Sequence, residues 1–125
     1  MKGLHLTADL YRCRCEPAWL TDAERLAAWC LAAMDAVGLE AVNRLFHPLP
    51  ATPEGPGGVT ATVLLAGSHI CLHTWPAERG VTIDVSVSNV GADQSAKARG
   101  LMEALVNRFQ PEWTERRSLD RGDES

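Results

Sequence analysis

The sequence predicts an α+β fold, a two-layer sandwich with two helices on one face of a mostly antiparallel sheet. Residues 81–88 alternate apolar with polar side chains, and residues 4–11 alternate in the same way, which is typical of half-buried strands. Two stretches with apolar residues at helical spacing are separated by several strand-like segments. The expected order is β-α-β-β-β-β-α-β, within a single domain over residues 1–117.

Both helices have recognisable starts. The first is expected over residues 22–37, where Thr21 and Glu24 have the spacing of a capping box with Thr21 as the N-cap. This helix stops at a glycine, as helices commonly do. The second is expected near residues 94–109, with Asp93 as its cap.

The strands are recognised by alternation and by β-prone runs between turn residues. Beyond residues 4–11 they are expected over residues 40–48, 59–65, 69–75, 81–88 and 111–117. The proline- and glycine-rich residues 50–58 predict a loop. The polar residues 118–125 predict a flexible tail.

Composition excludes several classes of protein. The net charge is −4 and the basic residues are scattered, so no nucleic-acid partner is expected. No apolar run approaches the ~20 residues that span a bilayer, and the start of the chain lacks a signal-peptide core, so we expect a cytoplasmic protein without a membrane partner. In that compartment the four cysteines are expected to be free thiols.

Nucleophilic and titratable side chains gather around one strand start and its neighbouring strand: Ser68, His69, Cys71 and His73, with Asp84 and Ser88. A serine hydrolase is disfavoured because the G-x-S-x-G elbow is absent, and a zinc helix because no H-E-x-x-H occurs. A pyridoxal-phosphate enzyme needs a Schiff-base lysine, yet Lys2 and Lys97, the only two, lie in no cofactor-like motif. The sequence therefore predicts neither a metal site nor pyridoxal phosphate.

The same stretch resembles a known family. Ser-His-x-x-x-His-Thr-Trp-Pro over residues 68–76, followed by Ile-Asp-Val over residues 83–85, is similar to the signature of bacterial and archaeal S-adenosylmethionine decarboxylases. Residues 4–11 resemble the first strand of that family, and Phe46-His47-Pro48 and Gly58-Val59-Thr60 resemble the segment before its cleavage site. The resemblance covers about residues 3–115.

The resemblance implies a self-processing, pyruvoyl-dependent decarboxylase of polyamine (spermidine) biosynthesis. The Ser68 hydroxyl would attack the Gly67 carbonyl, and the resulting ester would eliminate to dehydroalanine, whose hydrolysis leaves a pyruvoyl group derived from Ser68. That ketone would form a Schiff base with the substrate amine and accept electrons as carbon dioxide leaves. Cleavage between residues 67 and 68 of the 125-residue zymogen would give chains of 67 and 58 residues (125 − 67 = 58).

The resemblance also assigns roles to residues. His73 would assist processing and catalysis, and Thr60 would supply a helpful hydroxyl. Ser88 occupies the place of the family's catalytic cysteine, so the proton for the product carbon would come from Ser88, Cys71, His69 or a water. Substrate contacts are expected from Phe46, His69, Trp75 and Glu78. The implied assembly is a homodimer of processed protomers, and strand alternation places Ser68 and His73 on opposite faces unless the chain bends at Gly67.

Three positions depart from the family pattern. Gly67 and Ala77 stand where the family has glutamates, and Ser88 stands where it has the cysteine. The glutamate missing at residue 77 is associated with the substrate ribose, so the substrate is open between S-adenosylmethionine and a basic amino acid, L-ornithine or L-arginine. An unprocessed, non-catalytic paralogue that binds a small ligand or a partner subunit is the third hypothesis.

Overall fold

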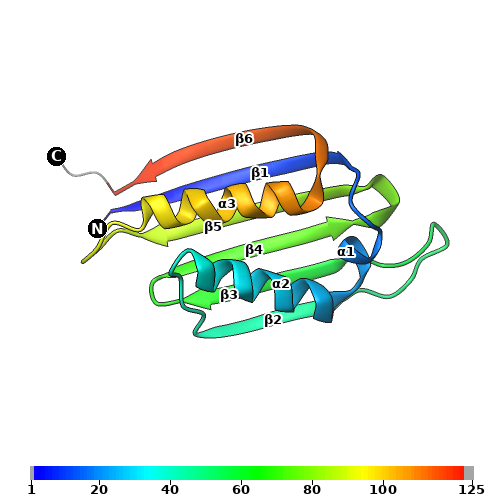
Figure 1. The fold of residues 1–125 in the computed structure, drawn as a ribbon, viewed down its shortest axis with the longest axis horizontal. Coiled ribbons are helices and arrows are strands. Elements are labelled where there is room, and N and C mark those ends of the chain that lie inside the picture. Colours follow the sequence, from blue (N-terminus) through cyan, green and yellow to red (C-terminus); the bar gives the residue numbers. More distant parts are fainter. Residues whose placement is uncertain (1, 123–125) are drawn as a thin grey trace.

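The computed structural model describes residues 2–122. One six-stranded antiparallel sheet has the order β2-β3-β4-β5-β1-β6, so the first and last strands along the chain lie side by side (Figure 1). The strands are β1 (Gly3–Cys13), β2 (Asn43–Pro48), β3 (Val59–Leu65), β4 (Ser68–Trp75), β5 (Gly80–Ser88) and β6 (Pro111–Arg121). The helices are α1 (Ala18–Thr21), α2 (Ala23–Ala36) and α3 (Ser95–Phe109), with a 3-10 turn η1 (Pro76–Glu78).

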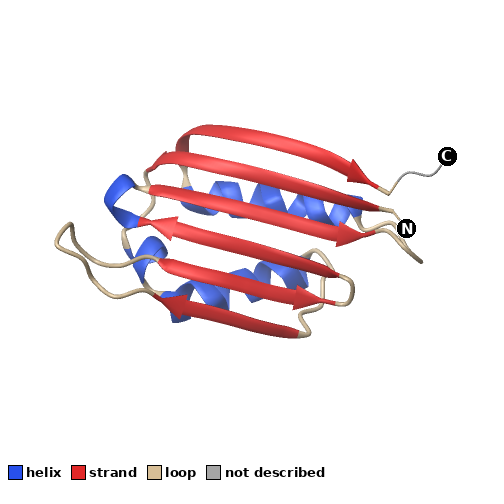
Figure 2. Ribbon diagram, turned by 180° about the vertical axis from the view of Figure 1, so that it is seen from behind, coloured by secondary structure: helices blue, strands red, loops and turns tan. Residues whose placement is uncertain are grey.

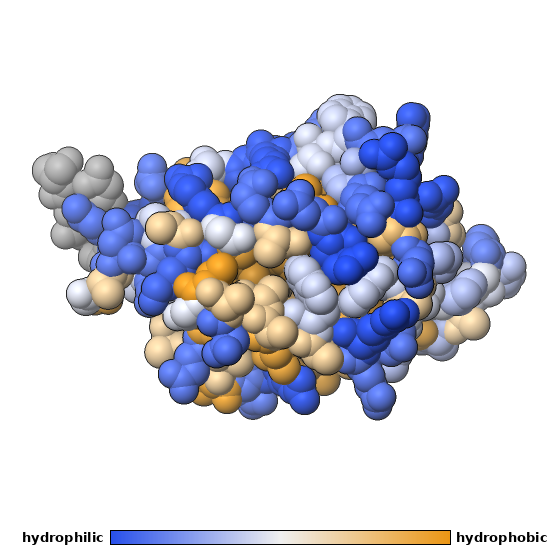
Figure 3. Space-filling model, in the orientation of Figure 1, coloured by the Kyte–Doolittle hydropathy of each residue, from blue (hydrophilic) through white to orange (hydrophobic). Residues whose placement is uncertain are grey.

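All three helices lie on one face of the sheet, and the other face is bare when the protein is seen from behind (Figures 1 and 2). The core lies between the helices and the sheet, where each of β1, β3, β4 and β5 buries every second residue. Figure 3 shows the helix side, where apolar residues gather along α2 and in the strip between α2 and α3. We call the opposite side the open face. In the four central strands it carries the residues that alternate with the core, among them Thr60, His73 and Asp84.

The predicted α+β class, the strand order along the chain and the two long helices are confirmed. The N-cap of α2 lies one residue later than the capping-box pattern predicts. Asp22 is the N-cap, and its carboxylate accepts the Arg25 amide, whereas the Thr21 hydroxyl donates to the Pro17 carbonyl within the short α1. Thr21, which the capping-box pattern predicts as the N-cap of α2, is therefore the last residue of the short helix α1.

Two further boundaries differ from the expectation. Gln94 occupies the N-cap of α3, while the Asp93 carboxylate accepts the Ser95 amide at 2.9 Å, which lowers the pKa of Asp93. The tail expected from residue 118 is part of β6 as far as Arg121, because β6 pairs with β1 down to Gly3. Residues 123–125 of that expected tail lie outside the described residues.

Thr74 ties the helix layer to the centre of the sheet. It is the one buried polar residue within residues 2–122, at 2 % exposure. Its hydroxyl donates to the Leu20 carbonyl of α1 at 2.7 Å and accepts the Val59 amide of β3 at 2.7 Å. One hydroxyl thus satisfies two buried backbone groups at the end of β4.

We predict that Thr74→Val lowers the free energy of unfolding by about 2–4 kcal/mol, because an amide and a carbonyl lose their buried partner. Denaturant unfolding measures the change. Thr62→Val is the matched control, because Thr62 is a half-buried threonine on the open face of β3. This variant should lower the free energy of unfolding clearly less than Thr74→Val does. Equal losses in the two variants would contradict the role given to Thr74.

Candidate active site

The bond expected to be cut lies in the turn between β3 and β4. Leu65 and Ser68 are register partners, so only Ala66 and Gly67 form the turn. Gly67 has a φ of +70°, a left-handed conformation that glycine adopts at little cost. Ser68 is the first residue of β4, and its Oγ accepts the Ser88 amide of β5 at 2.9 Å.

Ser88 is the residue of β5 that lies against this turn. A Cβ placed on Gly67 would lie 3.5 Å from the Ser88 Cβ and 3.9 Å from its Oγ. The Ser88 Oγ accepts the Val90 amide at 3.2 Å, so the hydroxyl keeps its own proton for donation. Both the backbone amide and the side chain of Ser88 therefore lie beside the Gly67-Ser68 peptide.

His73 lies further along β4, on the open face. It pairs in register with Thr60 of β3, and its Nδ1 lies 3.3 Å from the Thr60 Oγ1. The His73 ring is 6.3 Å from the Trp75 ring, at the end of the strand. The structure therefore brings together His73, Thr60 and Trp75 of the predicted site.

The two residues central to the expected processing are not brought together within one chain. Ser68 and His73 are five residues apart in an extended strand, which separates them by about 17 Å. They also belong to opposite faces, since His73 alternates with the buried Ile70, Leu72 and Thr74, whereas Ser68 has their parity. The strand shows no bend at Ser68, which pairs with Leu65 in the regular register of β3 and β4.

The other predicted residues are distributed as follows. His69 is exposed and Cys71 half-buried on the open face, where the Cys71 Sγ lies 3.0 Å from the Thr62 Oγ1. Phe46 of β2 instead packs against the core on the helix side, in register with the buried Ala61. Its ring therefore lies on the face opposite to His73, and a role in substrate binding stays a prediction.

Glu78 and Ala77 line a pocket beside Trp75, at the far end of β4 from Ser68. The pocket has a volume of about 200 Å³, and its walls come from the loop after β2 as well as from η1. Most of the lining is apolar: Leu49, Pro50, Pro56, Trp75, Pro76 and Ala77. Ala77, which stands where the family has its second glutamate, therefore lines a mostly apolar pocket whose one carboxylate is that of Glu78.

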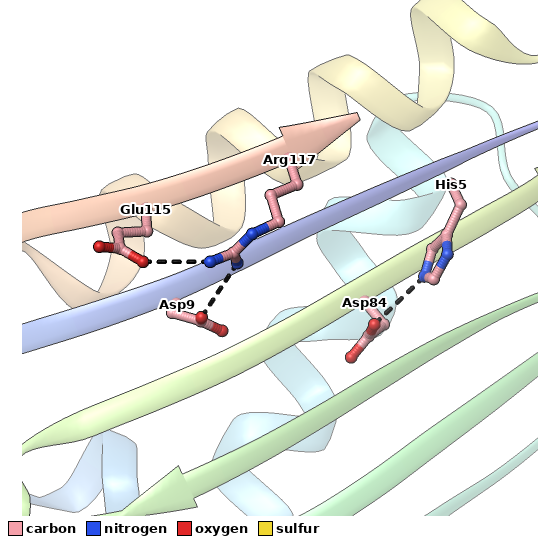
Figure 4. Close-up of polar contacts among 5 residues, drawn as sticks. All are labelled: His5, Asp9, Asp84, Glu115 and Arg117. Carbon is pink, nitrogen blue, oxygen red and sulfur yellow. Dashed lines mark hydrogen bonds and ion pairs between the residues drawn. The ribbon is translucent and has the colours of Figure 1, made fainter. Parts of the chain in front are cut away.

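Two groups of polar contacts on the open face, over β5, β1 and the edge strand β6, do not follow from the sequence alone (Figure 4). The His5 Nε2 lies 3.2 Å from the Asp84 Oδ1, across β1 and β5. Arg117 of β6 donates to Asp9 at 3.3 Å and to Glu115 at 3.2 Å. The alternation of β1 and β5 places His5, Asp9 and Asp84 on the polar side, but the register that pairs them comes only from the structure.

The cysteines and possible metal ligands add little chemistry to this site. Within residues 2–122 no three His, Cys, Asp or Glu side chains are grouped so as to hold a metal ion. All four cysteines are free. Burial raises the pKa of Cys30 to about 12, and burial with the neighbouring Cys15 raises the pKa of Cys13 to about 11.

Within residues 2–122, no helix is long and apolar enough to cross a membrane.

Comparisons with known proteins agree with the fold and the motif. The family model described as S-adenosylmethionine decarboxylase matches residues 4–122. A relative in Hydrogenobaculum, named S-adenosylmethionine decarboxylase proenzyme, is 30% identical over 120 residues, which cover 96% of this chain and 81% of the relative. A proenzyme of the same name in Archaeoglobus fulgidus is 28% identical and is covered to 97%. The crystal structure of the Aquifex aeolicus adenosylmethionine decarboxylase superposes with a TM-score of 0.81 at 26% identity, over 98% of this chain and 92% of that one.

Fold, motif and relatives together define the class of protein as a pyruvoyl-dependent carboxy-lyase that is made as a proenzyme. The chain belongs to the S-adenosylmethionine decarboxylase family.

We predict that Cys13, Cys15 and Cys30 stay unmodified when the native protein is treated with iodoacetamide at pH 8. Burial raises the pKa of each of these thiols, so the reactive thiolate is scarce below pH 9, and all three are buried. Peptide mass spectrometry locates the label, and the urea-unfolded chain is the control. Native labelling of Cys30 at the rate of the unfolded chain would contradict the prediction.

Proposed function

We propose that this chain cuts itself between Gly67 and Ser68 and, with the pyruvoyl group derived from Ser68, decarboxylates S-adenosylmethionine in spermidine biosynthesis in the cytoplasm. The observation that carries the proposal is the hydrogen bond between the Ser88 amide and the Ser68 Oγ at the tip of a hairpin, in a chain of this family. The names of the relatives support the same substrate. No metal and no pyridoxal phosphate are needed.

The residues of the hairpin suit the first step of processing. Because the Ser88 N–H occupies a lone pair of the Ser68 Oγ, the hydroxyl proton of Ser68 points elsewhere and is available to a base. The same N–H stabilises negative charge that develops on Oγ as it attacks the Gly67 carbonyl. Gly67 lets the turn adopt its φ of +70° without a side chain against Ser88.

One β4 holds Ser68 and His73 about 17 Å apart, so we propose that the histidine acting on Ser68 comes from a second copy of the chain. The open face has the character of a surface that a second copy covers. Of the nine exposed large hydrophobic side chains within residues 2–122, six lie on it, namely Tyr11, Leu45, Leu64, Trp75, Trp113 and Leu119. We therefore propose a homodimer with apposed open faces, in which His73 and Thr60 of each copy approach the other copy's turn before β4, where Ser68 is the first residue of the strand.

The pyruvoyl group supplies an electrophilic carbonyl that accepts the electron pair released with carbon dioxide. The product carbon then needs a proton. The Ser88 hydroxyl is next to the site and retains its proton, but a hydroxyl is a far weaker acid than the thiol (pKa ~8.5) that the family has there. His69 and Cys71, both on the open face, are the other candidates for the donor.

A second candidate substrate is favoured by the pocket at Ala77. An apolar wall of prolines, Leu49 and Trp75 suits methylene groups, and the Glu78 carboxylate suits a terminal cation. L-ornithine and L-arginine have this combination. The ribose of S-adenosylmethionine, in contrast, loses the partner that a glutamate at residue 77 offers.

Intact-mass spectrometry tests self-processing. We expect two chains that separate at Gly67-Ser68, the second with a blocked N-terminus, and an uncut Ser68→Ala variant. A single uncut chain of 13.6 kDa would overturn the proposal in favour of a non-catalytic paralogue.

Co-expression tests whether His73 acts between copies. Ser68→Ala and His73→Ala are each expected to stay uncut alone, because each lacks one of the two groups. When they are expressed together, the His73→Ala chain should be cut, since its partner supplies the histidine. Cleavage of the His73→Ala chain expressed alone would refute the arrangement, and the co-expressed pair of Ser68→Ala chains carrying distinct tags serves as the blank.

Carbon dioxide release from labelled S-adenosylmethionine, L-ornithine and L-arginine identifies the substrate. We expect Ala77→Glu to raise kcat/KM for S-adenosylmethionine by about tenfold or more, because a carboxylate that pairs with ribose hydroxyls contributes roughly 2 kcal/mol. Ala77→Gln introduces a side chain of the size of glutamate without its charge, so its kcat/KM for S-adenosylmethionine should rise less. If wild type prefers a basic amino acid and Ala77→Glu gains nothing on S-adenosylmethionine, the second candidate replaces the first.

A further inference from the structure

A second pocket lies at the end of the sheet where the chain would be cut. It has a volume of about 400 Å³ and is lined by Gly67 and Ser88 on one side and by Lys2, Gly3 and Arg121 on the other. Two cationic residues thus share a pocket with the residue whose carbonyl is attacked. The described lining contains no Asp or Glu.

The sheet register explains why this space exists. Gly3 pairs with Ser88 on one side and with Arg121 on the other, so these three residues form one row and share the open face. Gly3 has no side chain in the middle of this row, and backbone lies close to it, since a Cβ there would approach the Val87 carbonyl oxygen to 2.8 Å. The lining of the pocket extends along this row from Arg121 to the Gly67 turn.

The distances suit a long cationic side chain. Ser88 and Arg121 are two strand spacings apart, about 10 Å between backbones, which an arginine side chain spans in large part. The backbone of Lys2 is fixed by the bond from the Asn89 amide to the Lys2 carbonyl at 2.8 Å. Asp120 pairs with Leu4 and so belongs to the other face, away from this pocket.

We propose that this pocket receives the Gly67 carboxylate that self-cleavage releases, with Lys2 and Arg121 as its cationic partners. This inference rests on the proposed function. A site for the leaving group would act on the elimination step, and it would hold the new chain end beside the pyruvoyl group afterwards.

The chemistry at that step is an elimination. A base removes the Ser68 α-proton, the electron pair forms the Cα=Cβ double bond, and the bond between Cβ and the ester oxygen breaks. The bonding pair leaves with the oxygen, so Gly67 departs as a carboxylate with a full negative charge. No oxidant or reductant takes part. Cations within reach stabilise this charge as it develops, whereas the preceding attack of the hydroxyl leaves no such charged product.

The test follows processing after cell-free synthesis, by intact mass at timed points with and without hydroxylamine, which cleaves the ester. Lys2→Gln with Arg121→Gln should slow the appearance of the pyruvoyl chain about threefold to tenfold, as expected for the loss of partly exposed charge pairing. The uncut ester should accumulate and yield a Gly67 hydroxamate. Arg44→Gln, an exposed arginine on the opposite edge strand β2, is the matched control and should process at the wild-type rate.

A conservative variant separates charge from structure. Lys2→Arg with Arg121→Lys keeps both charges and should process at nearly the wild-type rate. The carboxylate site would be overturned if this conservative variant processed as slowly as the glutamine variant. It would also be overturned if the glutamine variant processed at the wild-type rate without accumulating the ester. Either result would leave the proposed function intact. A wild-type chain that stays uncut would overturn the proposed function and the carboxylate site together.

Discussion

The extended conformation of β4 is the constraint on which the rest of this site depends. β4 is held by β3 on one side and β5 on the other, and Thr74 anchors its far end to α1. A strand so restrained cannot fold back, so Ser68 at its start and His73 near its end remain apart. This separation is the reason for our proposal that a second copy supplies the histidine to Ser68.

The open face is suited to that requirement in two respects. Polar side chains over β5, β1 and β6 are already paired within the protomer, through His5 with Asp84 and through Arg117 with Asp9 and Glu115. The large apolar side chains of this face lie on β2, β3 and β4 and toward the ends of β1 and β6, where the tilted rings of Tyr11 and Trp113 are 5.1 Å apart. Charges that are paired within one protomer cost less to bury than charges that must find partners in the other.

Most of the fold could be predicted from the alternation of polar and apolar residues along the strands. In β1 and β5 the polar and apolar residues switch so regularly that both strands and their buried sides follow from sequence. Helix starts were less certain, because Thr21 and Asp22 are both good caps and only the short α1 decides between them. β6 is longer than its sequence predicts because its polar residues lie on an edge strand, where solvent rather than the core surrounds them. Of the candidate site, the motif located Ser68 and His73, but the contact of Ser68 with Ser88 depends on how β4 and β5 pair, which no local pattern contains.

The strand order has a consequence for a chain broken in the turn before β4. The piece up to Gly67 would contain β1, β2 and β3, and the remaining piece β4, β5 and β6, so three of the five neighbouring strand pairs (β3-β4, β5-β1 and β1-β6) would join different pieces. The two fragments are interleaved in one sheet, with β1 inserted between two strands of the other piece. They could separate only by dismantling the sheet, and reassembly after denaturation would become a bimolecular reaction. Cleavage would therefore be irreversible in practice. The cleaved protein keeps its structure while it stays folded, but after unfolding its two fragments no longer refold as one connected chain.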